Sequence, residues 1–265
     1  MDMTTPADQS LRQMRAAAPL VHCITNYVAM NIAANVLLAS GASPAMLHTP
    51  EESEEFAAIA GALTVNLGTL SPNWVDGAHK AIDGAQGAGK PWVLDPVAHY
   101  ASAWRAGITR ALVERRPTIL RGNASEILAL GGGTTTSKGP DAGDEVAAAE
   151  DTARALAAQL GSVVAVTGAQ DFVTDGTRAA RIDGGSPLMP LVTAMGCSLT
   201  CLVGAFAAAV DDPFDATVGA LALFAHAGAL AHDGAEGPAS FAVAFVDALH
   251  ATSPDALGAV RVTAA

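Results

Sequence analysis

The chain has 265 residues, of which 51% are hydrophobic and 15% are charged, with a net charge of −12. This composition excludes a disordered chain, and an acidic balance without a basic cluster argues against a nucleic-acid partner. The polar stretch 1–18 lacks the apolar segment of a secretory signal. Acidic residues and a proline at 211–215 interrupt the apolar stretch 197–231, so we expect no membrane span. Three cysteines without metal-type spacing suit a reducing, cytoplasmic location.

Short apolar runs alternate with longer alanine-rich segments through the first two thirds of the chain. The runs that we predict to be buried strands are Leu20–Ile24, Ala62–Asn66, Trp92–Asp95, Thr118–Arg121 and Val163–Thr167. The segments that we predict to be helices are Val28–Ala39, Pro72–Gln86, Ser125–Leu130 and Asp144–Gln159. Alternating strands and helices are typical of an α/β fold with a mostly parallel central sheet and helices on both faces. The length fits one large domain, and we expect residues 1–265 to form it.

The last third of the chain has a different pattern. Asp-Gly and Gly-Gly turns separate short segments that we predict to be antiparallel strands at one sheet edge, namely Phe172–Thr174, Ala179–Ile182 and Leu188–Val192. From Cys197 to His250 the pattern is nearly all helical, with breaks at Asp211–Pro213 and Asp233–Pro238. The stretch Gly131–Asp144 lacks the spacing of a phosphate loop, and we expect an exposed connection there.

Polar residues follow the predicted strands repeatedly. They are Thr25-Asn26, Asn66 with Gly68-Thr69, Asp95-Pro96, Arg121-Gly122-Asn123, Thr167-Gly168 and the Gly196-Cys197 turn. Each of them by itself fits turn or cap chemistry. Six in succession at one edge instead indicate a polar rim, at the carboxyl ends of the strands where open α/β sheets bind ligands.

Two acidic residues of this rim suggest a metal site. Asp95 ends one predicted strand, and Glu126 lies in the first turn of a helix just past the neighbouring strand. Carboxylates of this kind hold Mg²⁺ against substrate phosphates, often through water, although Glu126 alone also fits a first-turn acid favoured by the helix dipole. Arg121 ends a buried strand, and its guanidinium suits phosphate oxygens. Four histidines form no metal-ligand spacing, and we treat them as structural: His22, His48, His99 and His226.

The segment 192–204 places Cys197 at the start of an apolar helix, directly after Gly196. The first amides of a helix have no internal partners and attract a phosphate or a developing oxyanion. The same field lowers the pKa of a thiol. A small, inert core cysteine is the alternative, and the surrounding polar rim favours the phosphate site.

Taken together, several blocks of residues resemble the hydroxyethylthiazole kinase family, in that family's order and over roughly residues 19–210. The blocks are His22-Cys-Ile-Thr-Asn-Tyr-Val-Ala-Met-Asn31, Gly41-Ala-Ser-Pro-Ala-Met46, Asn66-Leu-Gly-Thr-Leu-Ser71, Leu94-Asp-Pro-Val97, Arg121-Gly-Asn-Ala-Ser-Glu126, Val166-Thr-Gly168, and Gly196-Cys197 with Val203-Gly-Ala-Phe206. The resemblance implies a ribokinase-like three-layer sandwich. It also implies a thiamine-salvage reaction in which ATP, with Mg²⁺, phosphorylates the primary alcohol of a hydroxyethyl-methylthiazole. The implied assembly is a homotrimer with active sites between subunits.

The resemblance also implies a role for each matching position. The residues that would bind ATP are Arg121, Asn123, Thr167 and Gly168. The residues that would lie near the thiazole are Asn26, Met46, Gly68 and the backbone of Ala194. Asp95 and Glu126 would organise the Mg²⁺-bound phosphates. Gly196 and Cys197 would be the catalytic positions, with their amides as an anion hole. Cys197 stands where most ribokinase-like enzymes carry a catalytic aspartate, and a loose phosphoryl-transfer transition state does not require a strong base there.

The chain departs from the family pattern on the thiazole side. The anion-hole loop, usually Thr-Gly-Ala-Gly-Cys, is Thr193-Ala-Met-Gly-Cys197, and the usual Gly-Ala-Gly after Asp-Pro-Val is Ala98-His-Tyr100. His22-Cys23 replaces the usual His-Asn. Glycine serves where backbone approaches a ligand or takes a positive φ, so we expect these changes to crowd the pocket or to alter its loops.

Two alternatives therefore stay open. One is a ribokinase-like kinase for another small heterocyclic alcohol. The other is a catalytically weak homologue that binds thiazole or nucleotide. The retained Asp95, Glu126 and Cys197 argue against the second, because a pure binder does not need a set of phosphate-handling residues.

Overall fold

Nine strands form one continuous sheet in the computed structural model, which describes residues 5–133 and 145–265. The strands are β1 (Leu20–Ile24), β2 (Ser43–Ala45), β3 (Ala62–Asn66), β4 (Trp92–Asp95), β5 (Ile119–Asn123), β6 (Val163–Thr167), β7 (Gln170–Thr174), β8 (Ala179–Asp183) and β9 (Val262–Ala264). Their spatial order is β2-β1-β3-β4-β5-β6-β7-β8-β9. Strands β1 to β6 pair in parallel, and β7, β8 and β9 extend the sheet with antiparallel pairs.

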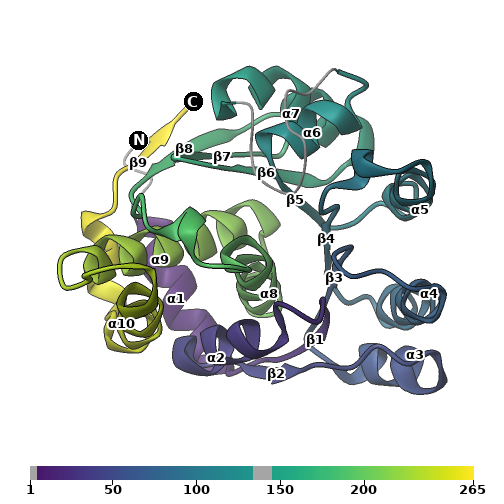
Figure 1. Ribbon diagram of the computed structural model, residues 1–265, viewed down its shortest axis with the longest axis horizontal. Helices are drawn as coiled ribbons and strands as arrows, with labels where there is room; N and C mark the ends of the chain where they lie inside the picture. Colours follow the sequence, from purple (N-terminus) through teal and green to yellow (C-terminus); the bar gives the residue numbers. More distant parts are fainter. Residues whose placement is uncertain (1–4, 134–144) are drawn as a thin grey trace.

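Helices cover both faces of the sheet, so the molecule has three layers (Figure 1). On one face lie α1 (Thr5–Ala17), α2 (Met30–Ser40), α8 (Met195–Ala207), α9 (Pro213–His232) and α10 (Pro238–Ala251). On the other face lie α3 (Pro50–Ile59), α4 (Pro72–Gly87), α5 (Ala103–Val113), α6 (Ala124–Leu130) and α7 (Val146–Leu160). Three short 3₁₀ turns complete the described structure: His99–Ala101, Met189–Leu191 and Pro254–Ala259.

Each face of the sheet packs its own apolar core. Along β1, Cys23 belongs to the core under α8 and Ile24 to the core under α4. The same alternation separates Val93 from Leu94 in β4 and places successive residues of β5 and β6 on opposite faces. Side chains of a strand alternate between faces, so strands without polar alternation are buried on both sides, as parallel sheets require.

Most predicted elements are confirmed, with small shifts at their ends. The predicted strand Thr118–Arg121 is observed as β5, one residue later at its start and two at its end. The predicted helices correspond to α2, α4, α6 and α7, and the helical last third divides at both predicted breaks. Caps set several helix starts: Ser71 accepts the N–H of Trp74 before α4, and Asp212 accepts the N–H groups of Phe214 and Asp215 before α9.

Two expectations differ from the structure, and several elements were not predicted. The predicted strand Leu188–Val192 is wrong, because Pro190 lacks the N–H that a strand needs and the segment forms the 3₁₀ turn Met189–Leu191. The apolar helix begins at Met195 rather than Cys197. The sequence patterns did not predict the helices α1, α3 and α5 or the edge strands β2 and β9. Beyond Gly133, the predicted connection Gly131–Asp144 lies outside the described residues.

Helix α9 is long and apolar enough to cross a membrane, but 78% of its apolar window is buried inside the protein. It packs between α1, α8 and α10 (Figure 1). It is therefore the central helix of one apolar core rather than a candidate span.

The strand register gathers polar side chains at the carboxyl edge of the sheet. Asn66 of β3 aligns with Asp95 of β4, and Asn123 of β5 aligns with Thr167 of β6. The first turn of α8 lies over the same edge, because a Cβ on Gly196 would come within 2.8 Å of the Arg121 guanidinium nitrogens. The predicted polar rim is thus assembled from β3, β4, β5, β6 and α8.

Candidate active site

Asp95 lies at the centre of the carboxyl edge, and the residue is 1% exposed. Its Oδ2 accepts hydrogen bonds from Asn66 Nδ2 at 2.7 Å and from Thr200 Oγ1 at 2.8 Å. Arg121 Nη1 donates to the same oxygen at 3.3 Å. Donors from β3, α8 and β5 therefore hold this carboxylate in one orientation.

Arg121 forms the floor of the site beneath the start of α8. Its Nη1 pairs with Asp95 and its Nη2 donates to Thr167 Oγ1, while its buried Nε has no hydrogen-bond partner among residues 5–133 and 145–265. Gly196 makes this packing possible, because a Cβ there would lie 2.8 Å from both terminal guanidinium nitrogens. A buried ion pair of this kind is costly to break, since removing one partner leaves the other charge buried and unpaired.

Asn26, one of the residues predicted to lie near the thiazole, connects the sheet to Cys197. Asn26 Nδ2 donates to Asn66 Oδ1 at 2.8 Å and to Cys197 Sγ at 3.4 Å. Asn66 Oδ1 also accepts the N–H of Gly68 at 2.9 Å. A Cβ at Gly68 would lie 2.5 Å from the Asn26 side chain. Glycine at position 68 is therefore required for this close approach.

Cys197 does not have the lowered pKa expected for a thiol at a helix start. Burial raises the pKa of its thiol to about 11, and the negative charge of Asp95 adds to the increase. The hydrogen bond from Asn26 and the positive charge of Arg121 act in the opposite direction and are outweighed. The group is thus a neutral thiol at physiological pH, and the helix field does not turn it into a thiolate base.

Glu126 is almost fully buried and has two structural partners. Its Oε1 accepts the N–H of Ala98 at 2.9 Å, and its Oε2 accepts the N–H of Asn123 at 2.8 Å. Asn123 Oδ1 in turn accepts the N–H of Glu126 at 2.9 Å, which completes a capping box at the start of α6. Burial, followed by the negative charge of Asp95, raises the pKa of Glu126 to about 7.

The mutual repulsion of Asp95 and Glu126 bears on the predicted Mg²⁺ site. Among the described residues, no group of three or more histidine, cysteine or acidic side chains could hold a metal ion by itself. Two carboxylates fit an ion that arrives with substrate phosphates and keeps several waters, which is the usual mode for Mg²⁺. A cation there would also relieve the repulsion that raises the Glu126 pKa. The donor set therefore fits a substrate-borne Mg²⁺.

Three of the residues predicted to bind ATP, Thr167, Gly168 and Asn123, lie at the ends of β5 and β6. Asp171 Oδ1 accepts the N–H of Gly168 at 2.9 Å and so holds the turn between β6 and β7. Burial raises the pKa of Asp171 to about 6. Thr167 is buried beside Arg121, so the structure joins these two predicted ATP residues directly.

The departures Ala98 and Ala194 keep the backbone conformation that glycine favours. Ala98 has φ 47° and ψ 38°, and Ala194, which precedes α8, has φ 62° and ψ 16°. An L-residue in this left-handed region costs roughly 1–2 kcal/mol. Met195 is buried in the core under α8. Met46 follows β2 and packs, partly buried, against that same core.

Sequence reasoning missed two residues that shape the site. Thr200 lies one helical turn after Gly196 and donates to Asp95. Arg105, at the start of α5, donates to the carbonyl oxygens of Leu67 and Gly68 and, at 3.1 Å, to that of Val97. A threonine one turn inside an apolar helix was the available signal for Thr200. The role of Arg105 depends on long-range contacts that leave no local pattern.

Residues 11–255 match the model of the family described as "Hydroxyethylthiazole kinase family". The chain belongs to the hydroxyethylthiazole kinase family. A hydroxyethylthiazole kinase of Gemmatimonas aurantiaca is 66% identical over 98% of this chain and 93% of its own length. One of Rhizobium etli is 64% identical over 94% of this chain and 97% of its own length.

Solved structures place this family member among ribokinase-like kinases. A hydroxyethylthiazole kinase protein of Pyrococcus horikoshii has a TM-score of 0.89 at 37% identity, over 98% of each chain. The pyridoxal kinase of Staphylococcus aureus, solved in complex with ADP, has a TM-score of 0.61 at 15% identity, over 81% of this chain and 89% of its own, which shows a shared fold alone. The ribokinase-like three-layer sandwich is thus confirmed, and this hydroxyethylthiazole kinase family member is an enzyme.

Proposed function

We propose that this kinase transfers the γ-phosphoryl group of ATP to the primary alcohol of hydroxyethylthiazole, as a step of thiamine biosynthesis or salvage. Relatives with that name are 60–66% identical over nearly the full chain. The observation that carries the proposal is the buried network of Asp95, Arg121, Asn66 and Thr200 directly beneath the first turn of α8. Residues 1–265 would form one domain around it.

On the donor side, Arg121, Thr167, Asn123 and Gly168 would bind ATP. Arg121 supplies a fixed positive charge whose buried Nε has no partner within the described residues. Asp95 and Glu126 would hold a phosphate-bound Mg²⁺, which would neutralise charge on the phosphate oxygens. Phosphoryl transfer needs positioning and charge neutralisation more than covalent chemistry, and rigid, pre-oriented groups supply both.

At the start of α8, the amides around Gly196 and Cys197 would stabilise the transferring group as an anion hole. The first N–H groups of a helix have no internal partner and lie at its positive end. A neutral Cys197 thiol adds an S–H donor without adding a second negative charge beside Asp95. This arrangement favours a mechanism in which hydrogen-bond donors stabilise the transition state, rather than one in which a thiolate acts as the base.

On the acceptor side, Asn26, Met46, Gly68 and the backbone of Ala194 would surround the thiazole. Ala194 has a left-handed backbone conformation despite its Cβ. This supports a loop before α8 that follows the same path as in family members with glycine at this position. The departures from the family pattern lie here, yet the similar relatives named hydroxyethylthiazole kinase support the thiazole as acceptor rather than another small heterocyclic alcohol.

We further infer a homotrimer with active sites between subunits, in the cytoplasm. Large apolar side chains beside the acceptor residues are exposed: Tyr27 by 68%, Val28 by 55% and Leu191 by 63%. Exposed apolar groups next to a site suit a subunit contact. The three free cysteines suit a reducing compartment. Light scattering that gives three times the mass of the chain would support the trimer, and a monomer would contradict it.

The direct test is steady-state turnover with ATP, Mg²⁺ and hydroxyethylthiazole. We expect formation of the thiazole phosphate and a requirement for a divalent cation. No thiazole turnover together with phosphorylation of another heterocyclic alcohol would show that the acceptor is wrong. Calorimetric binding of thiazole or nucleotide without turnover of any alcohol would instead identify a catalytically weak homologue.

A further inference from the structure

Asn66 joins the two halves of the site. It is the last residue of β3 and is 2% exposed. Its Nδ2 donates to Asp95 on the phosphate side at 2.7 Å. Its Oδ1 accepts from Asn26 Nδ2 at 2.8 Å and from the N–H of Gly68 at 2.9 Å, both on the acceptor side. One buried amide is thus shared between groups with different proposed tasks.

The chemistry of the partner groups sets the direction of the hydrogen bonds that run from Asp95 through Asn66 to Asn26. Asp95 Oδ2 accepts from the donor-only guanidinium of Arg121 and from Thr200, and Asn66 Oδ1 accepts the N–H of Gly68, so Asn66 turns its NH₂ toward Asp95 and its oxygen toward Asn26. At the far end, the backbone N–H groups of Val28 and Ala29 can only donate, and both reach Asn26 Oδ1 at 3.1 Å. Asn26 is thereby required to present its NH₂ to Asn66 and to Cys197.

We propose that Asn66 is a positioning residue that links the phosphate side to the acceptor side. It fixes Asn26 with an N–H directed at Cys197 Sγ, 3.4 Å away, so that the sulfur accepts and its own proton is directed elsewhere. The proposal rests on the proposed function. Asn66 acts through Asn26, Gly68 and Asp95. Its loss would therefore lower the rate of transfer more than the binding of either substrate.

A second anchor makes this role separable from folding. Arg105 Nη2 donates to the carbonyl oxygen of Gly68, so the backbone of that loop stays held when the Asn66 side chain is removed. Asn26 Oδ1 is held by the N–H groups of Val28 and Ala29, whereas within the described residues the only other partner of its NH₂ is Cys197. Small misplacements of catalytic groups can cost about 100-fold in rate. Asn66→Ala is expected to remove the partner that orients the Asn26 NH₂, while the Asn26 Oδ1 contacts and the loop stay in place.

The test is a double-variant cycle on purified enzyme with ATP, Mg²⁺ and the thiazole alcohol. Asn66→Ala should lower kcat by about 10- to 100-fold, with the KM for ATP changed less than about threefold. Asn66→Ala/Asn26→Ala should be no slower than the slower single variant, because residues that act as a unit are non-additive. Asn35→Ala, which removes an exposed Asn35–Asn31 amide contact, is the matched control and should leave kcat unchanged.

Fold-changes that multiply in the double variant, or an unchanged kcat in Asn66→Ala, would overturn the proposal. If Asn66→Ala does not fold, Asn66→Thr keeps a hydroxyl that can donate to Asp95, as Thr200 does, and suits a strand. Its shorter side chain does not hold Asn26 at the same distance, so we expect an intermediate kcat, and a wild-type kcat would contradict us. If the wild type prefers another alcohol, the proposed function fails, and the same cycle measured with that alcohol still decides the role of Asn66.

Discussion

Clusters of aspartate and arginine lie at both ends of the parallel strands, at the carboxyl edge and at the opposite, amino edge. The two clusters differ in burial. At the carboxyl edge, the Asp95 and Arg121 side chains are 2% and 9% exposed. At the amino edge, Arg178 pairs with Asp175 and Asp212 with its own side chain 46% exposed. Buried charges interact strongly with whatever enters their site, whereas exposed pairs are screened by solvent. Composition alone therefore does not distinguish a reactive cluster from a structural one.

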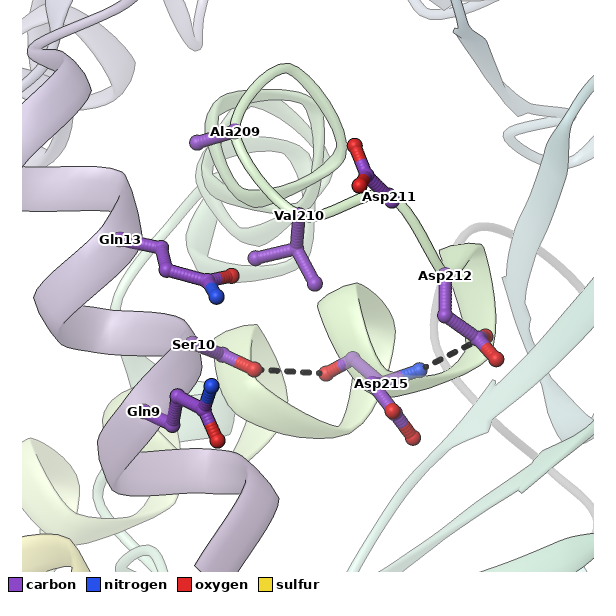
Figure 2. A pocket seen from close by; sticks show the side chains of 8 residues that line it. All are labelled: Gln9, Ser10, Gln13, Ala209, Val210, Asp211, Asp212 and Asp215. Atoms are coloured by element: carbon purple, nitrogen blue, oxygen red, sulfur yellow. Dashed lines mark hydrogen bonds between the residues drawn. The ribbon is translucent and has the colours of Figure 1, made fainter.

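The amino edge also contains an acidic cavity of about 320 Å³ between α1 and the turn from α8 to α9 (Figure 2). Two of its acidic residues, Asp212 and Asp215, have structural partners. Asp212 accepts the N–H groups of Phe214 and Asp215 as the cap of α9, and Ser10 Oγ donates to the backbone oxygen of Asp215. Helix capping and the pairs with Arg178 thus account for Asp212 and Asp215. At the carboxyl edge, by contrast, the hydrogen-bonded amides of Asn66 and Asn26 link Asp95 to Cys197.

The largest expected effect is at the buried pair. Asp95→Ala leaves Arg121 buried and unpaired, which should lower the free energy of unfolding by about 3–5 kcal/mol and abolish measurable turnover. Urea denaturation followed by circular dichroism measures the first effect, and the coupled kinase assay the second. Near-wild-type stability of Asp95→Ala would mean that the pair is solvated, and the contrast between the edges would fail.

The free energy of unfolding of the apo enzyme should decrease as pH rises, because of Glu126. Its folded-state pKa is raised from 4.5 to about 7, so between these values the native state keeps a proton that the unfolded chain loses. The free energy of unfolding should therefore decrease as pH rises from about 4.5 to about 7, by at most about 1.4 kcal/mol per pH unit from this group. Glu126→Gln should flatten the profile. An equally steep profile in the variant would assign the effect elsewhere.

Alanines in the left-handed region provide a smaller and matched comparison. Ala194→Gly at the carboxyl edge and Ala18→Gly at the amino edge both replace an alanine of positive φ, at 62° and 43°. Each should raise the free energy of unfolding by about 1 kcal/mol. Only Ala194→Gly should alter the KM for the thiazole alcohol. If both variants change that KM equally, the acceptor loop is not special.

The smallest effect is expected for Arg178→Ala. Its ion pairs are exposed, so they contribute about 0–1 kcal/mol, and the guanidinium also stacks on Phe214 at 4.5 Å. We expect a small loss of thermal stability and an unchanged kcat. A clear decrease in kcat would show that the amino edge communicates with the site.

The sequence predicted the elements that follow strong local patterns and the polar residues that end them. The bounds of β1, β3, β4 and β6 agree with the apolar runs, and Asn66, Asp95, Arg121 and Thr167 meet at the predicted edge. Short edge strands such as β2 and β9 are set by pairing with the rest of the sheet, which no local pattern shows.

Other features depend on contacts between distant parts of the chain. Glu126 forms a capping box at the start of α6, as its first-turn position allowed, and the proposed metal role would use the same carboxylate. The high pKa of Cys197 arises from burial and from Asp95, which is 102 positions earlier in the printed sequence. Neither the environment of that thiol nor the contact between Thr200 and Asp95 can be derived from residues near in sequence.

The most direct measurement follows labelled phosphate from γ-labelled ATP into hydroxyethylthiazole in a single turnover, with wild type, Asp95→Asn and Arg178→Ala side by side. We expect rapid transfer in wild type and Arg178→Ala, and transfer at least about 100-fold slower in Asp95→Asn. Equal transfer rates in all three proteins would contradict a reaction centred on the buried carboxyl edge.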